Sequence, residues 1–181
     1  MPRIRSLRSN VTREQAEEHF SRTGPVAIMK GLVSGPVRSV AEIYIPFRLF
    51  RVEIIEPART QSQFLAVDVV KGNLDLYQFD QAPEAIVLET RNCPPSVIDE
   101  ERARQLVIEK FRRVVFSQGF FRLRSPEFAA TPLPGEIHVP YWVAFRGQGA
   151  FAHLEVIDAV RRRPEGAKVR RMLEEWLAST A

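Results

Sequence analysis

The sequence EIYIPFRL at residues 42–49 returns, with the same pattern, as EIHVPYWV at residues 136–143. Each copy is followed by a second similar stretch, VDVVK at 67–71 and IDAVR at 157–161. Self-similarity at a fixed spacing is typical of duplicated supersecondary units. The pattern therefore predicts two tandem copies of one unit, related by a pseudo-twofold axis.

Alternation of apolar and other residues identifies the strands. Ile43, Ile45 and Phe47 alternate with other side chains, which predicts a strand over residues 43–55 and its counterpart over 137–146. Further strands are expected over residues 64–70, 74–79, 85–90 and 151–160, so that a helix followed by an antiparallel meander makes each unit. Polar or Pro- and Gly-rich composition predicts loops at 56–62 and 129–135.

Three helices are expected from their start signals and apolar periodicity. Thr12 to Gln15 reads as a capping box, with Val11 placed to contact Ala16. A long helix should begin at Ser96 or Asp99 and reach about residue 118, and a last helix should cover 164–178. We therefore predict an α+β fold with two units, residues 1–92 and 93–181, joined at the Cys93-Pro94-Pro95 stretch and completed by a C-terminal helix.

A proline occurs in the middle of each repeated strand, at Pro46 and Pro140. Proline has no N–H to donate to a neighbouring strand, so we expect both strands at a sheet edge or at a bulge. Residues two apart share a face, and this places Tyr44 and Arg48 on one face and His138 and Trp142 on the matching face. The residues on this face differ between the two copies, and we predict that the face is the binding surface. Burial of the His138 and Trp142 side chains is the alternative.

Asp68 and Asp158 stand at the same place in the two copies, near a strand end. A carboxylate there can accept main-chain N–H groups and hold the turn that follows. General acid–base catalysis is the alternative, and it requires both carboxylates in one cleft. We favour the turn.

Positive charge gathers at two places. Residues 1–13 hold four arginines and no acid, which matches the net charge of +4. A second basic patch is expected around the last helix, at Arg161, Arg162, Arg163, Arg170 and Arg171. Together they could bind nucleic acid or another polyanion, whereas the interspersed glutamates favour an ordinary solvated face.

The chain shows no metal-ligand spacing among its three histidines and Cys93, no phosphate-binding loop and no nucleophile elbow. We expect no cofactor and no metal, and the prediction leans away from an enzyme, with a small enzyme using a His138–aspartate cleft as an alternative. A single cysteine, no secretory signal and no long apolar run favour the cytoplasm without a membrane span.

The segment TREQA at 12–16, followed by strands and then VDVVKGNL at 67–74, resembles the PepSY-type module. The similarity covers residues 12–80 and, more loosely, 99–161, where Asp158 is kept but the turn glycine is not. The resemblance implies a non-enzymatic α+β module that binds peptides or proteins, often outside the cytoplasm. Our prediction is a protein- or peptide-binding or assembly module that can self-associate, with nucleic acid as a less favoured partner.

Overall fold

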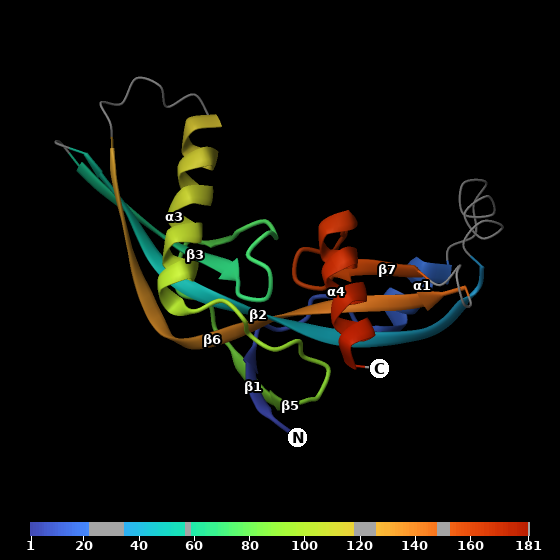
Figure 1. Ribbon diagram of the computed structural model, residues 1–181. Helices are drawn as coiled ribbons and strands as arrows, with labels where there is room; N and C mark the ends of the chain where they lie inside the picture. Colours follow the sequence, from blue (N-terminus) through green and yellow to red (C-terminus); the bar gives the residue numbers. More distant parts are fainter. Residues whose placement is uncertain (22–34, 57–58, 118–125, 148–152, 181) are drawn as a thin grey trace. The chain divides into compact units, whose positions relative to one another are not determined.

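The computed structural model describes residues 1–21, 35–56, 59–117, 126–147 and 153–180. Within these residues, three helices and an eight-stranded, mainly antiparallel sheet form a mixed α+β fold, which confirms the predicted class (Figure 1). The strands are β1 (Arg3–Ser6), β2 (Val37–Glu56), β3 (Arg59–Asp68), β4 (Tyr77–Phe79), β5 (Ile86–Glu89), β6 (Glu127–Arg146), β7 (His153–Asp158) and β8 (Arg163–Pro164). The helices are α1 (Arg13–Ser21), α3 (Glu100–Ser117) and α4 (Ala167–Thr180).

The chain forms two compact units. Unit 1 comprises Met1–Ile45, Ile86–Pro94 and Val139–Ala181, and unit 2 comprises Pro46–Ala85 and Pro95–His138. The long strands β2 and β6 each contribute residues to both units. Each unit therefore draws on both halves of the chain, which is a different division from the predicted repeats 1–92 and 93–181.

The core of unit 2 lies between α3 and one face of the β2–β3 hairpin, where helix and sheet lie side by side in Figure 1. Phe50 pairs with Leu65 across the hairpin, so both side chains share a face. The apolar stripe of α3 covers this face with Ala103, Val107, Phe111 and Val115. Period-two strands and a period-3.6 helix thus bury one common layer.

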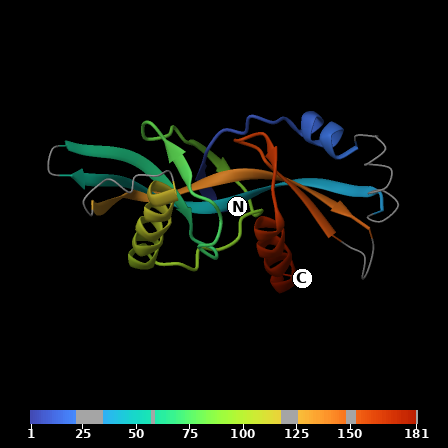
Figure 2. The same cartoon turned by 90° about the horizontal axis from the view of Figure 1, so that it is seen from above.

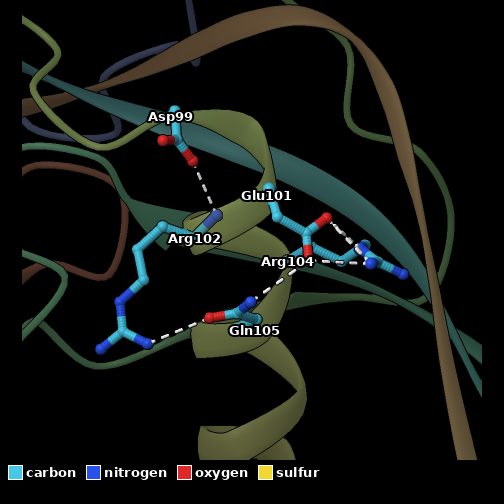
Figure 3. Close-up of polar contacts among 5 residues, drawn as sticks. All are labelled: Asp99, Glu101, Arg102, Arg104 and Gln105. Carbon is cyan, nitrogen blue, oxygen red and sulfur yellow. Dashed lines mark hydrogen bonds and ion pairs between the residues drawn. The ribbon is translucent and has the colours of Figure 1, made fainter.

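The start of α3 agrees with its sequence signals. Asp99 Oδ1 accepts the main-chain N–H of Arg102 at 2.8 Å, which is an N-cap (Figure 3). One turn later, hydrogen bonds from Arg104 and Gln105 hold the pKa of Glu101 below its ordinary value. These side chains are exposed, so their ion pair and hydrogen bonds contribute little to stability.

In unit 1, α1 and α4 cover opposite faces of the β6–β7 hairpin (Figures 1 and 2). Ala16 and Phe20 of α1 pack against Trp142 and Ile157, which pair across the hairpin. On the other side, α4 contacts β7 and buries Val169, Met172 and Leu173. Because both faces are covered, residues 139–144 of β6 are buried without alternation.

The predicted capping box of α1 is confirmed. Gln15 N donates to Thr12 Oγ1 at 3.3 Å, and Thr12 N donates to Gln15 Oε1 at 3.0 Å. Val11 packs against the cluster that contains Ala16 and Phe20, as expected of a hydrophobic staple. The last helix starts later than predicted, at Ala167, because Pro164 pairs with Ile157 in β8.

Two predicted loops are wrong. Residues 59–62 of the expected connector extend β3, and the hairpin pairs Glu56 with Arg59. Their polarity reflects exposure at the outer end of the hairpin. Residues 129–135 belong to β6, where Gly135 adopts a φ of 76°, so a strand containing prolines bends at a glycine instead of ending. The sequence also suggests a strand over residues 120–123, and this segment lies outside the described residues.

Part of the basic segment at residues 1–13 is a strand. Residues 3–6 form β1, in which Ile4 and Ser6 are buried while Arg3 and Arg5 are exposed. The period-two pattern is present in the sequence, but the arginines obscure it. The predicted strand at 85–90 is confirmed as β5, yet it pairs with β1 and so is not the last strand of the meander.

Of the two expected placements of the prolines, at a sheet edge or at a bulge, the sheet edge is wrong. β2 and β6 each have a neighbour on both sides in the strand order β4-β3-β2-β6-β1-β5. Pro46 stands one residue before the pair Phe47–Asp68, and Pro140 one residue before Tyr141–Asp158. A proline fits there because each hairpin ladder begins at the next residue.

Candidate functional site

Asp68 is fully buried and is surrounded by main-chain donors. Its Oδ1 accepts Lys71 N at 2.9 Å and Gly72 N at 2.7 Å, and its Oδ2 accepts Leu74 N at 2.8 Å. Gly72 has a φ of 70°, which a side chain would strain. The carboxylate therefore fixes the turn after β3, as the sequence predicts.

Asp158 does the same after β7. It is fully buried, and its Oδ1 accepts Val160 N at 2.9 Å and Arg161 N at 2.8 Å. Each hairpin also has the same kind of main-chain hydrogen bond within itself. Val69 N donates to Pro46 O in one hairpin and Ala159 N donates to Pro140 O in the other, both at 3.1 Å. The turns after β3 and β7 therefore have equivalent local contacts, and a buried carboxylate holds each turn.

Tyr44 and Arg48, the first two predicted binding residues, are half-buried and engaged. Tyr44 Oη donates to Glu42 Oε2 at 2.7 Å in unit 1, and burial followed by this bond raises the pKa of the phenol above its ordinary value. Arg48 Nη1 donates to Glu100 Oε2 at 2.5 Å in unit 2, and its Nη2 lies 3.6 Å from Glu136 Oε1. Each side chain is held by carboxylates of its own unit.

His138 and Trp142, the other two, are buried with 7% and 6% exposure, in units 2 and 1 respectively. Trp142 Nε1 donates to Val11 O at 2.8 Å, and the Arg13 guanidinium lies 5.7 Å from the ring centroid. Burial with a satisfied indole N–H gives Trp142 a role in packing α1 onto β6.

The five residues of the predicted basic patch lie on the turn after β7, on β8 and on α4. Arg161 Nε lies 3.9 Å from Asp158 Oδ2, and Arg163 Nε lies 3.4 Å from Glu165 Oε1. Arg162 and Arg171 are exposed, and Arg170 is half-buried. Carboxylates thus neutralise part of the patch. The same holds for the N-terminal segment, where Arg3 lies 3.4 Å from Glu89.

The β5 edge, residues 86–89, presents main-chain groups outward. Thr90 N donates to Pro2 O at 3.2 Å, and this pair continues the β1–β5 register, which joins Leu88 to Ile4 and Val87 to Arg5. Antiparallel pairs alternate between hydrogen-bonded and non-hydrogen-bonded. Ile86 and Leu88 therefore direct their N–H and C=O groups to β1, whereas Val87 and Glu89 direct theirs away from it.

Nothing in the described part of the chain pairs with the outer side of β5. It is the last strand of the order, with β1 as its neighbour. The Val87 side chain is 66% exposed, and Ile86 and Leu88 are half-buried. A sheet edge with apolar side chains and no charge between 85 and 88 is open to pairing with another strand.

A shallow depression lies beside β4. Gln63, Gln78 and residues 79–84 line it, and its charged members are the acids Asp80 and Glu84. The residues that line it include no nucleophile–base pair. Among the described residues no three His, Cys, Asp or Glu side chains gather as a metal site, and no described helix is long and apolar enough to cross a membrane.

Comparison with protein-family models, curated proteins and solved structures finds no match. Sequence reasoning selected the central strands β2 and β6, and it overlooked β5 as a surface. The available signal was the uncharged, apolar run Ile86-Val87-Leu88.

Proposed function

We propose that this chain is a non-catalytic protein- or peptide-binding or assembly module whose contact surface is the β5 edge. The observation that carries the proposal is the outward direction of the Val87 and Glu89 main-chain groups beside an exposed Val87 side chain. An extended partner segment can add to such an edge as a further strand.

The polar side chains that suggested chemistry have structural partners instead. Asp68 and Asp158 hold turns, Tyr44 donates to Glu42, and Trp142 donates to Val11. Strand addition needs none of them, because main-chain hydrogen bonds supply affinity and alternate side chains supply specificity. This supports a binding role over catalysis at the predicted His138–aspartate pair.

The duplication belongs to the same proposal. The matching contacts of Asp68 and Asp158, and of Pro46 and Pro140, support two copies of one helix–meander unit related by a pseudo-twofold axis. The single Cys93 supports residence in the reducing cytoplasm.

The test is a selection of random linear peptides on the immobilised full chain, followed by affinity measurement against variants. Val87→Pro removes the outward N–H, which an edge strand tolerates, and should weaken the selected peptides by about tenfold or more. Val97→Lys is the matched control, because Val97 is also exposed, at 73%, and lies outside β5. Peptides that bind both variants equally well, or a selection that yields none, would contradict the proposal.

A further inference from the structure

We infer that the strand received by the β5 edge is β5 of a second copy of the chain, giving a symmetric dimer. This inference rests on the proposed function and names its partner. A second copy is the natural occupant only if the edge can pair with itself, so register and charge decide the matter.

The direction of the main-chain groups selects the register. Val87 and Glu89 face outward, and by alternation Ala85 does too. An antiparallel pair centred on Val87 places Val87 opposite Val87 of the second copy, and Ala85 opposite its Glu89. Every outward N–H and C=O of residues 85–89 then meets a partner. The twofold axis stands perpendicular to the sheet, so the interface is self-complementary.

Side chains agree with this register. Val87 shares its face with Arg5, its partner on β1, and in the dimer two exposed valines become cross-strand neighbours. Residues 85–88 carry no charge, so no like charges stand opposite each other at the centre. Glu89 faces an alanine and is already paired with Arg3 of its own chain at 3.4 Å. A register shifted by two residues would instead place the valine opposite this carboxylate.

The length of β5 sets the strength of the contact. The strand has four residues, so the contact falls in the small interfaces, below about 1,200 Å², that are typical of transient complexes. We therefore expect a dimer that forms with rising concentration and dissociates on dilution.

Sedimentation of the full chain over a concentration series tests the dimer. The wild type and Val97→Lys should shift from monomer to dimer at the same concentration, whereas Val87→Lys should stay monomeric. Val87 is exposed, and far-UV circular dichroism verifies that the variant is folded. A wild type that stays monomeric throughout, or a dimer that survives Val87→Lys, overturns the inference.

A gain of contact provides a second test that needs no disruption. In a Cys93→Ser background, Val87→Cys places two thiols on strands whose paired Cα atoms would be about 5.5 Å apart, within disulfide range. Rapid oxidation to a covalent dimer is expected for Val87→Cys and not for Val97→Cys. Equal rates for the two variants overturn the inference.

The outcomes separate this inference from the proposed function. Peptides that bind in a Val87-dependent way to a chain that never dimerises would reject the second copy and leave a module for other proteins. Absence of both dimer and such peptides would reject both.

Discussion

Replacing Asp68 with asparagine should destabilise unit 2 severely, although the change is nearly isosteric. The retained oxygen can still accept Lys71 N and Gly72 N. The new amide NH₂ takes the place of Oδ2 and faces the N–H of Leu74, so two donors meet in a fully buried site.

The magnitude follows from these contacts. Loss of the hydrogen bond between Leu74 N and a charged acceptor costs about 1.5–3 kcal/mol. The two remaining bonds become neutral and weaker, which adds about 1 kcal/mol. A loss of about 3 kcal/mol corresponds to a melting midpoint lower by roughly 6–12 °C for a chain of this length.

Thermal unfolding followed by far-UV circular dichroism measures this shift. This probe is appropriate because Trp142 and Trp176 lie in unit 1, so tryptophan fluorescence follows that unit and not unit 2. Asp80→Asn is the matched control, since Asp80 is exposed in the same unit, and its midpoint should stay close to that of the wild type. Equal midpoints for Asp68→Asn and Asp80→Asn would refute the turn-holding role.

Three further variants test other contacts. Trp142→Phe keeps a buried ring but removes the indole N–H bond and some packing, so urea unfolding followed by Trp176 fluorescence should show a loss of about 2 kcal/mol. A stability equal to that of the wild type would argue against its packing role. Gly72→Ala should cost about 1–3 kcal/mol by urea denaturation, because φ is 70° and a Cβ would lie 2.6 Å from Leu106 Cδ1; no loss would contradict the positive φ. Burial and then the charge of Asp158 raise the pKa of Glu165, so the stability given by its protonated form is present below the ordinary glutamate pKa and is lost as pH rises through the raised one. Glu165→Gln should therefore gain stability relative to the wild type as pH rises above the ordinary glutamate pKa, whereas a stability difference that does not change with pH would show no linkage.

Local rules predicted the structure well where few residues decide it. The capping box at Thr12, the start of α3 after Asp99 and the turn carboxylates all appear as expected. Each depends on a donor and an acceptor that are only a few residues apart, so both partners can be recognised in one short segment of the sequence.

Long-range pairing could not be predicted in the same way. The partner of β5 is β1, more than eighty residues away, as the pairing of Arg3 with Glu89 shows. Alternation identifies a strand but not its neighbour in the sheet. For this reason the predicted meander wrongly includes the strand at 85–90, which pairs with β1. The same limit applies to Trp142, whose burial depends on α1 and not on its own strand.

In the proposed dimer, a second copy completes the open outer side of β5. Amide hydrogen exchange at Val87 and Glu89, measured in dilute and concentrated samples, tests this pairing most directly. Both amides should exchange fast when dilute and slow down with concentration, while the Leu88 amide, bonded to β1, stays protected in both. Protection of Val87 in the dilute sample, or exchange that concentration does not change, would contradict the account.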